Sequence, residues 1–392
     1  MRDEPRVAFT GYYGMRNFGD DLFGVLCAAA ARRFWNAAPR LIGPPLAGLD
    51  APGTWPRALP RDWYGGTGIA GRTARLLGFA RGLRGSDVLV LGGGSVINAR
   101  RSFRTPLMRS AQRRGRLRLA ALGVSIGPFP DAAAQAAAAR NARAFSYIAV
   151  RDRRSFELAQ ARGLGEVAHD GRDLAGLLPL LFPRNGRDGK AGPRTVGIAP
   201  CRYAVRDDHP APACDAWLDA CVDALAGAAA PLRVRVFCLN SHPEHGDEAI
   251  ATRLHARLRE RGVDAVLQRY DGRDPLATVG GIADCDAFIS ARLHGAIVSY
   301  LCGVPFTMVE YHPKCRDFAD DIGLDAACRI TSRWCGRAAF ADAIATMLNE
   351  DATPVRLSPD LYARQALGIF QCAPWSISLP PTIAPMPRAT AP

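Results

Sequence analysis

Residues Asp286-Ala-Phe-Ile-Ser-Ala-Arg-Leu-His-Gly-Ala296 decide how this chain is interpreted. The apolar run that begins at Asp286 predicts a buried strand, and the residues after it predict the start of a helix. Open α/β sheets place their ligand sites at the carboxyl ends of such strands. Because residues two apart in an extended segment share a face, Ser290, Arg292 and His294 are expected to point into one pocket. Taken alone, the same pattern is typical of a core histidine and a surface arginine, so the neighbouring segments must decide.

Length and charge set the outer limits of the interpretation. A chain of 392 residues is long enough for two domains or for one large α/β unit. Its 50 lysines and arginines exceed its 37 acidic residues, which gives a net charge of +13. Nearly all of these cations are arginine, which binds phosphate and carboxylate groups in a bidentate way. Anionic ligands are therefore favoured, although a genome rich in G and C would produce the same bias.

Several classes of function and location are disfavoured. The basic residues are scattered along the chain without a zinc-finger spacing or an aromatic-interleaved basic helix, so we expect no nucleic-acid partner. The 11 cysteines contain no C-x-x-C pair and predict reduced thiols rather than a metal cluster or a disulfide framework. No apolar run is long enough to span a bilayer, and the N-terminus lacks a signal core. We expect a cytoplasmic protein, with peripheral contact to anionic lipid at the inner face of the cytoplasmic membrane left open.

Strands and helices alternate through the first half of the chain, which is typical of a parallel sheet. Strands are predicted at 7–10, 87–91, 117–122 and 147–150, and helices at 20–35, 103–114, 131–145 and 152–162. We place a first Rossmann-like domain at 1–183. The glycine-, proline- and charge-rich residues 184–193 predict a linker.

The alternation restarts after this linker. Strands are predicted at 195–199, 232–238, 286–290 and 306–310, and helices near 213–228 and 247–261. We place a second Rossmann-like domain at 194–350, facing the first across a cleft, which is the usual location of a ligand site. A C-terminal extension at 351–392 ends in a proline-rich tail that is expected to form no regular element.

The loops after the predicted strands carry polar chemistry. Gly11-Tyr-Tyr-Gly-Met-Arg-Asn-Phe-Gly-Asp-Asp21 fits neither the dinucleotide fingerprint nor the P-loop. Its tyrosines and Asn17 are natural sugar contacts, whereas Asp20 could simply cap the next helix. The glycines of Leu91-Gly-Gly-Gly-Ser-Val96 would let backbone N–H groups approach a ligand, or would only form a tight turn. The segment 43–71 is either an acceptor loop or a variable surface connection.

Together these segments resemble the polysaccharide pyruvyl transferase family, in which they recur in the same order. The resemblance spans about residues 7 to 325 and rests on the motifs Y-Y-G-x-x-N-x-G-D at 12–20, L-G-G-G at 91–94, S-I-G-P at 125–128, V-R-D-x-x-S at 150–155 with Asp173-Leu-Ala175, S-x-R-L-H-G at 290–295 and Y-x-P-K at 311–314.

The resemblance implies two Rossmann-like domains arranged as in GT-B glycosyltransferases. It implies transfer of pyruvate from phosphoenolpyruvate to two hydroxyls of a sugar as a cyclic ketal. No divalent-metal motif is visible in the sequence, so we expect no metal and no cofactor. The acceptor would belong to a bacterial exopolysaccharide or a cell-surface glycan precursor. The second domain would bind phosphoenolpyruvate through Arg202, Ser290, Arg292, Leu293, His294 and Lys314, with His294 and Arg292 catalytic. The first domain would bind the acceptor through Tyr12, Tyr13, Asn17, Asp20, Gly93 and Gly94.

The chemistry of phosphoenolpyruvate agrees with this choice of residues. The molecule carries a carboxylate and a phosphate on an enol ether, so its site must hold two anions and protonate a carbon. Arginine provides a planar double grip on such anions. Histidine is the most common general acid near neutral pH, and a nearby phosphate favours its protonated form. We therefore expect His294 to be the proton donor.

Two other functions are compatible with the same sequence. A GT-B-type nucleotide-sugar glycosyltransferase would have the same two-domain architecture but would release a nucleotide. A non-catalytic sugar- or anion-binding protein of this fold would keep its function without His294. The acceptor sugar and its linkage to lipid, the stereochemistry of the ketal and the oligomeric state do not follow from the sequence.

Overall fold

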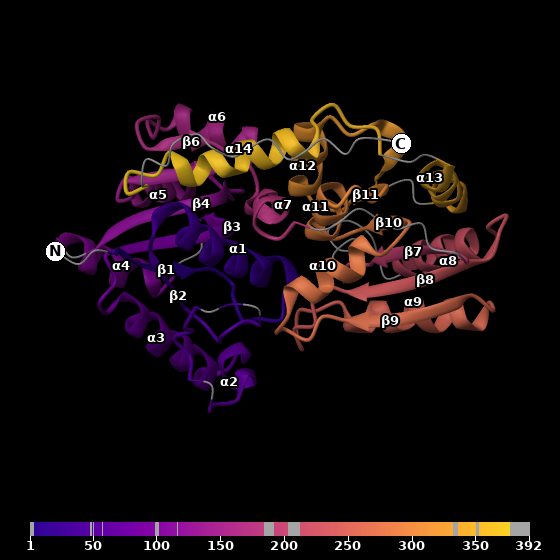
Figure 1. Cartoon of the computed structure of the whole chain (residues 1–392), viewed down its shortest axis with the longest axis horizontal. Coiled ribbons are helices and arrows are strands. Elements are labelled where there is room, and N and C mark those ends of the chain that lie inside the picture. The colour runs from indigo at the N-terminus through magenta and orange to yellow at the C-terminus, as the bar shows by residue number, and fades with distance from the viewer. Residues whose placement is uncertain are drawn as a thin grey trace.

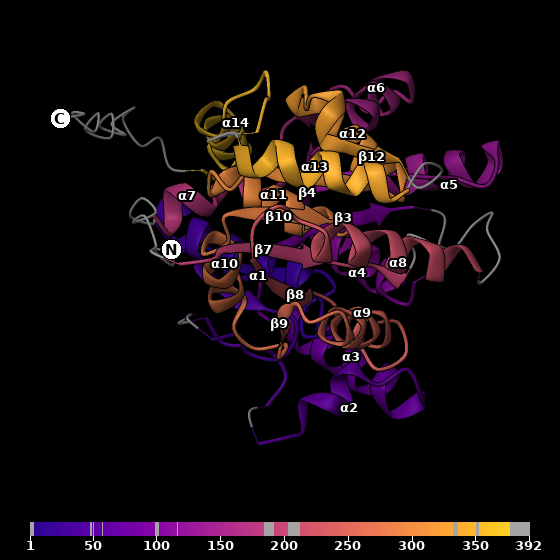
Figure 2. The same cartoon turned by 90° about the vertical axis from the view of Figure 1, so that its right-hand side faces the viewer.

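The computed structural model describes residues 4–47, 49, 51–56, 58–98, 102–115, 117–183, 192–202, 212–331, 336–349 and 353–376. Most of the predicted linker and the end of the proline-rich tail therefore lie outside the described residues. The described chain forms two parallel sheets, each with helices on both faces, which we call the N-lobe and the C-lobe (Figures 1 and 2). None of its helices is both long enough and apolar enough to cross a bilayer.

The N-lobe sheet has the strand order β2-β1-β3-β4-β5-β6. Its inner strands are buried on both faces, as β5 shows with four buried residues out of four, which explains their continuous apolar sequences. The strands are β1 (Arg6–Thr10), β2 (Ala38–Leu41), β3 (Val88–Ile97), β4 (Arg118–Ile126), β5 (Tyr147–Val150) and β6 (Ala168–Asp170). The helices are α1 (Phe18–Trp35), α2 (Arg61–Gly65), α3 (Ile69–Leu83), α4 (Arg104–Arg113), α5 (Ala132–Ala142), α6 (Arg153–Ala161), η1 (Leu174–Leu177) and α7 (Leu178–Leu181).

The C-lobe sheet has the strand order β12-β11-β10-β7-β8-β9. Ser290 at the end of β10 lies opposite Ala199 of β7 and Met308 of β11, so these strands end at one edge of the sheet. The strands are β7 (Arg194–Ala199), β8 (Leu232–Cys238), β9 (Asp264–Arg269), β10 (Ala287–Ser290), β11 (Phe306–Glu310) and β12 (Arg329–Thr331). The helices are α8 (Pro212–Ala226), α9 (Glu248–Glu260), α10 (Pro275–Ala283), α11 (Leu293–Leu301), α12 (Pro313–Ile322), η3 (Ala326–Cys328), α13 (Arg337–Asn349) and α14 (Pro359–Gln371).

The last described helix, α14, returns from the C-lobe to the N-lobe, where Figure 1 shows it above β4. Phe370 packs on Trp35 of α1 with ring centroids 4.6 Å apart, and the indole N–H of Trp35 donates to the backbone oxygen of Phe370 at 2.8 Å. The hydroxyl of Tyr147 donates to the backbone oxygen of Ile369 at 2.8 Å. The C-terminal extension therefore contributes a helix to the N-lobe core.

The lobes are also joined by a short backbone bridge. Asn17, just before α1, forms an antiparallel bridge with Asn240, just after β8. The N–H of Phe18 donates to the oxygen of Leu239 at 2.9 Å, and the N–H of Ser241 donates to the oxygen of Arg16 at 3.0 Å. The chain on the two sides of this bridge lines two different cavities between the lobes.

The glycine run that follows Leu91 does not form the tight turn that its sequence suggests. It continues β3, with Gly94 paired to Val124 and a register shift before Ile97 pairs with Ile126. Gly93 and Gly94 have φ values of 80° and 84°, which L side chains rarely adopt. A Cβ at Gly93 would also overlap the ring of Phe23. The glycines thus allow a bulged strand to pass close to α1.

Candidate active site

A cleft of about 320 Å³, which we call the central cleft, opens between the lobes at the ends of the strands. Its N-lobe wall comes from the β1–α1 loop, from the glycine run of β3 and from the end of β5. Its C-lobe wall comes from the starts of α11 and α12. The polar or charged lining residues and glycines are Tyr12, Asn17, Gly19, Asp20, Gly93, Gly94, Ser95, Arg151, Arg292, His294 and Lys314.

Three helices begin at this cleft. Phe18 opens α1, Leu293 and His294 open α11, and Lys314 lies in the first turn of α12. The backbone N–H groups of Leu293 and His294 have no acceptor among the described residues. Helix starts carry unsatisfied N–H donors and a partial positive charge, which favour a bound anion. The backbone alone therefore makes the cleft attractive to a negatively charged ligand.

Arg292 is fixed by a buried carboxylate. Its Nε and Nη2 donate to Oδ2 and Oδ1 of Asp247, each at 2.6 Å, and Asp247 is fully buried. Burial alone would lower the pKa of the guanidinium, but Cys201 and the Asp247 carboxylate outweigh burial and raise it. Two of the arginine donors are thus used to orient the side chain at the edge of the cleft.

Arg151 and Lys314 also line the cleft. Lys314 forms no ion pair with a carboxylate in the described chain, and its ammonium lies 5.6 Å from the ring centre of Tyr311. Burial lowers the pKa of Lys314, and the charges of Arg292 and Arg151 lower it further. Such mutual repulsion among three clustered cations would be relieved by an anion placed between them.

His294 lies next to a carboxylate that belongs to the other lobe. Its Nε2 is buried, has no hydrogen-bond partner among the described residues, and lies 3.7 Å from Oδ2 of Asp173. Burial alone would raise the pKa of Asp173, but His294 and Arg151 outweigh burial and lower it. The edge of Phe23 packs against the imidazole with centroids 4.8 Å apart. A Cβ at Gly19 would overlap Nδ1 of His294, so only glycine leaves room for this ring.

A buried network of hydrogen bonds stands behind this pair. Arg151 donates through Nη1 to Oδ2 of Asp173 at 3.1 Å and through Nε to the hydroxyl of Ser125 at 2.7 Å. Ser125 in turn donates to Oδ2 of Asp152 at 2.6 Å, and Oδ1 of Asp152 accepts the N–H of Ser155. The segments 125–128, 150–155 and 173–175 therefore act together to hold one carboxylate beside His294.

Asp20 is the acidic side chain on the N-lobe wall of the cleft. Burial raises its pKa, and this effect is opposed by the positive charges of His294, Lys314, Arg151 and Arg292. A carboxylate with a raised pKa beside four basic groups can exchange a proton with a bound ligand.

The structure brings most of the predicted site residues together in the central cleft, but three lie elsewhere. Tyr13 is buried in the core and donates its hydroxyl to the oxygen of Gly92 at 2.8 Å. Ser290 is also buried, and its hydroxyl donates to the oxygen of Arg292 at 2.6 Å, which shapes the turn into α11. The Nη1 of Arg202 donates to the oxygen of Glu244 at 2.6 Å, outside the cleft. In this geometry the three residues shape or flank the site rather than line it.

Sequence reasoning missed the partners of the predicted residues. Asp173, Asp247 and Arg151 were not among the predicted site residues, although Arg151 and Asp173 lie in motifs that carried the resemblance. Arg151 directly follows a predicted buried strand, and Asp173 directly precedes a short apolar helix. A charged residue at such a position was the available signal. Nothing in the sequence near Asp247 links it to Arg292.

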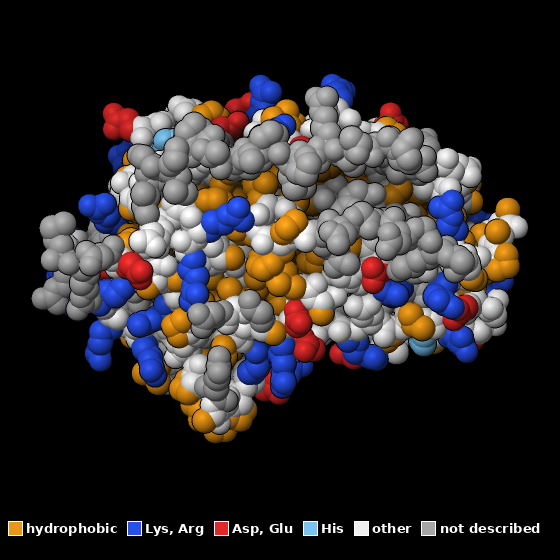
Figure 3. Space-filling model, viewed as in Figure 1, with side chains coloured by type: hydrophobic (Ala, Val, Ile, Leu, Met, Phe, Trp, Pro, Cys, Tyr) orange, Lys and Arg blue, Asp and Glu red, His pale blue; other side chains and the backbone are white. Residues whose placement is uncertain are grey.

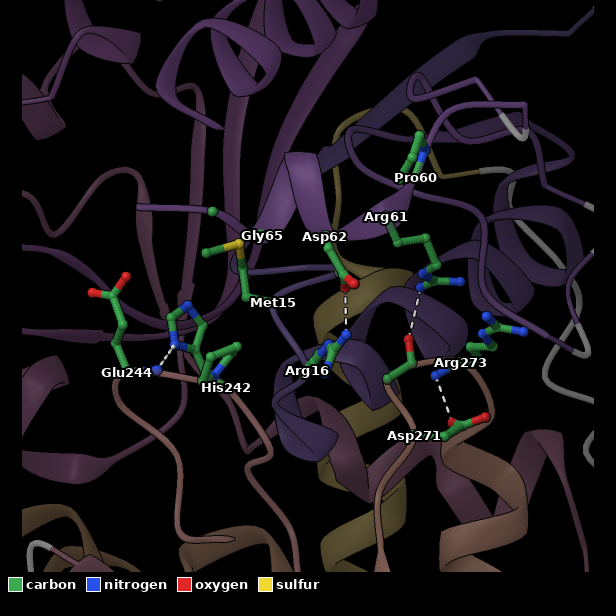
Figure 4. A pocket seen from close by; sticks show the side chains of 14 residues that line it. Met15, Arg16, Pro60, Arg61, Asp62, Gly65, His242, Glu244, Asp271 and Arg273 are labelled. Atoms are coloured by element: carbon green, nitrogen blue, oxygen red, sulfur yellow. Dashed lines mark hydrogen bonds and ion pairs between the residues drawn. The ribbon is translucent and has the colours of Figure 1, made fainter. Parts of the chain in front are cut away.

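A second cavity of about 300 Å³ lies on the other side of the Asn17–Asn240 bridge (Figure 4). Arg16 has a left-handed φ of 56° and forms an ion pair with Asp62, while Arg61 reaches across the lobes to donate to the oxygen of Gly272 at 2.7 Å. The Nε2 of His242 is buried without a hydrogen-bond partner in the described chain. Part of the segment 43–71 thus lines a cavity between the lobes. Neither cavity contains a group of three or more metal-ligating side chains among the described residues.

Comparisons with known proteins give one family and several similar folds. The family model described as polysaccharide pyruvyl transferase matches residues 17–313. No curated protein matches the chain in sequence. A UDP-N-acetylglucosamine 2-epimerase from Rickettsia bellii has a TM-score of 0.57 at 11% identity, covering 94% of each chain.

Two further solved structures have a similar fold. A putative UDP-N-acetylglucosamine 2-epimerase from Listeria monocytogenes has a TM-score of 0.54 at 10% identity, covering 93% of this chain and 92% of its own. Anabaena Alr3699/HepE, solved with UDP and glucose, has a TM-score of 0.51 at 13% identity, covering 94% and 95%. At such low sequence identities the similarity concerns the fold alone. It confirms two Rossmann-like domains in a GT-B-like arrangement.

Proposed function

This chain belongs to the polysaccharide pyruvyl transferase family, and we propose that its central cleft transfers pyruvate from phosphoenolpyruvate to two hydroxyls of a saccharide as a cyclic ketal. The acceptor would be a sugar of a bacterial exopolysaccharide or of a cell-surface glycan precursor. The observation that carries this proposal is the meeting of Arg151, Arg292 and Lys314 with the His294–Asp173 pair at one cleft.

The cation cluster suits the two anionic groups of phosphoenolpyruvate. Arg292, oriented by Asp247, would grip one anionic group, and Lys314 with the first turns of α11 and α12 would hold the other. Burial and then the charges of Arg292 and Arg151 lower the pKa of Lys314, and a bound anion would offset the repulsion among these cations. Asp20 and Asn17 on the opposite wall would orient the acceptor hydroxyls.

The first step would be proton transfer to carbon. His294 as imidazolium, with Nε2 toward Asp173, donates a proton from Nδ1 to the methylene carbon, and the π electrons of the double bond form the new C–H bond. Positive charge develops at the carbon that bears the phosphate. An acceptor hydroxyl forms a C–O bond there and loses its proton to Asp20.

The second step would close the ketal. The C–O bond to phosphate breaks, inorganic phosphate leaves with the bonding electrons, and the second hydroxyl forms a C–O bond at the same carbon. The protons balance over the whole reaction. The two acceptor hydroxyls lose two protons, while the methyl group gains one and the released phosphate gains the other. Neither step requires an oxidant, a reductant or a metal, so we expect turnover to be insensitive to a chelator.

The decisive experiment measures phosphate release from phosphoenolpyruvate with a panel of pyranoside acceptors. Mass spectrometry should find acceptors whose mass has increased by one pyruvic acid minus one water. This product is expected both with wild type and with the control variant His255→Ala. His255 lies in α9, and its Nε2 is 3.2 Å from the oxygen of Ala265. The variant His294→Ala should lose at least about a hundredfold in rate, the usual contribution of a general acid.

Three outcomes would contradict the proposal. Phosphoenolpyruvate that is neither bound nor consumed with any acceptor would exclude it. Release of an ultraviolet-absorbing nucleotide from a nucleotide sugar would favour a glycosyltransferase. Full activity of the variant His294→Ala would remove the histidine from the reaction.

A further inference from the structure

Exposed apolar side chains gather on one face of the N-lobe. Of the ten large apolar side chains that the described chain exposes, five lie between residues 59 and 77. They belong to α2, to α3 and to the turns beside them, which form the lower edge of the molecule in Figures 1 and 2. These exposed side chains are Leu59 (37%), Trp63 (58%), Ile69 (83%), Leu76 (40%) and Leu77 (63%). We call residues 59–84 the apolar–basic face.

The helix α3 is amphipathic in an unusual sense, because its small residues face inward and its large ones outward. The buried positions of α3 are Gly71, Ala74, Gly78, Phe79 and Gly82, so only one large side chain is used for packing on the lobe. Leucine and isoleucine occupy its exposed positions instead. A surface helix of a protein with no partner has the opposite distribution. This face is therefore built to be covered by something outside the described chain.

The charge around the face indicates what covers it. Arg72, Arg81 and Arg84 are exposed and have no carboxylate partner among the described residues. Taken over the whole chain the arginines are scattered, but residues 59–130 contain 13 arginines and two acidic residues, Asp62 and Asp87. Both aspartates are already paired, Asp62 with Arg16 and Asp87 with Arg6 at 3.1 Å. This stretch therefore holds most of the net charge of +13.

We propose that residues 59–84 dock the protein onto an anionic lipid surface. Exposed leucine, isoleucine and tryptophan together with unpaired arginines are the composition of helices that lie in the membrane interface. The arginines would contact anionic headgroups while the apolar side chains enter the boundary of the acyl chains. Figure 3 shows hydrophobic side chains at this lower tip with lysine and arginine side chains around them. A folded protein partner would have to supply many acidic groups to match this excess of positive charge.

The same segment also connects the surface to the space between the lobes. Trp63 is exposed on α2, while its neighbours Arg61 and Asp62 line the second cavity. A lipid surface held at α2 would therefore border that cavity. This juxtaposition does not depend on the reaction in the central cleft.

The proposal is tested by co-sedimentation of the full chain with two kinds of vesicle. One contains phosphatidylcholine mixed with phosphatidylglycerol, and the other contains phosphatidylcholine alone. Wild type should bind the first and not the second. The variant Ile69→Ser/Leu77→Ser should lose most of this binding, whereas Val266→Ser/Leu361→Ser, which removes two exposed apolar side chains elsewhere, should not.

A second pair of variants tests the charges. Each arginine near an anionic surface contributes roughly a fivefold increase in binding, so Arg72→Gln/Arg81→Gln should weaken binding by roughly 25-fold. The matched variant Arg259→Gln/Arg364→Gln removes two exposed arginines from α9 and α14 and should bind like wild type. Tryptophan emission should shift to the blue on anionic vesicles in wild type and not in Trp63→Phe.

Several results would overturn the proposal. Failure of folded wild type to bind the anionic vesicles would exclude it. If each control variant lost as much vesicle binding as the variant it is matched with, overall net charge or nonspecific hydrophobic adsorption would drive the binding. If wild type is a dimer that Ile69→Ser/Leu77→Ser converts to a monomer without any effect of vesicles, the face is a protein interface.

Discussion

At the scale of single residues, the site depends on carboxylates that orient other groups. Asp173 and Asp247 do not line the central cleft, yet each holds a side chain that does. Sequence analysis can find Arg292 and His294 because a cation and an imidazole after a buried strand are chemically distinctive. It does not link these two residues to their carboxylate partners, because buried aspartates are also common as helix caps. Only the fold brings Asp173 of one lobe to His294 of the other.

The variant Asp173→Asn tests this positioning role. We expect kcat to fall by at least about a hundredfold with a smaller change in KM for phosphoenolpyruvate, because the imidazole loses the carboxylate that orients it. The variant also removes the nearer carboxylate of the buried Arg151 and leaves it paired with Asp152 at 4.0 Å, which costs up to roughly 3–5 kcal/mol of unfolding free energy. Steady-state phosphate release and urea unfolding measure the two effects.

The pH dependence of the same variant provides its control. Because the pKa of Asp173 is lowered below its ordinary 3.8, the carboxylate stabilises the fold fully above that pH. This contribution should disappear as the pH falls through the lower folded-state pKa. The stability difference between wild type and Asp173→Asn should therefore be flat near neutral pH and shrink in acid. A difference that grows in acid would contradict the assignment.

At the scale of elements, strands were easier to predict than the segments between them. The predictions at 147–150, 232–238 and 306–310 match β5, β8 and β11 in full. The strands β5 and β11 are buried throughout, whereas β8 has the alternation of apolar and polar residues that is typical of a half-exposed strand. The short edge strand β6 reads Ala-His-Asp and has no such signal. The helix α3 was missed because its glycines weaken helix propensity and its apolar residues face outward. The glycine run of β3 was interpreted as a turn because positive φ values serve turns and bulges alike.

The start of α1 offers a test at this scale. Alanine at position 19 should favour the helix, since alanine has the higher propensity by about 1 kcal/mol. Its Cβ would nevertheless overlap the ring of His294, so we expect kcat to fall at least tenfold. The matched variant Gly368→Ala in α14 adds a Cβ with nothing within 4 Å and should keep full activity. Equal activity of Gly19→Ala and wild type would show that the imidazole is free to move.

At the scale of the whole molecule, the two lobes share a core through α14. Phe370→Ala should lower the unfolding free energy by roughly 3–5 kcal/mol, the usual cost of removing a buried phenylalanine. It should leave KM for phosphoenolpyruvate unchanged while the protein is folded, because the central cleft is lined by other elements. Urea unfolding and phosphate release measure the two effects. A loss smaller than about 1 kcal/mol would mean that α14 is only loosely attached.

The pairing of Asp173 with His294 also matters for how such proteins can diversify. In the proposed reaction, neither half of the gene would encode a complete reaction centre, since the imidazole comes from the second half and its carboxylate partner from the first. Lobes exchanged between relatives to combine new specificities would have to preserve this pair. Exchange of whole lobes is thereby constrained at one contact between them.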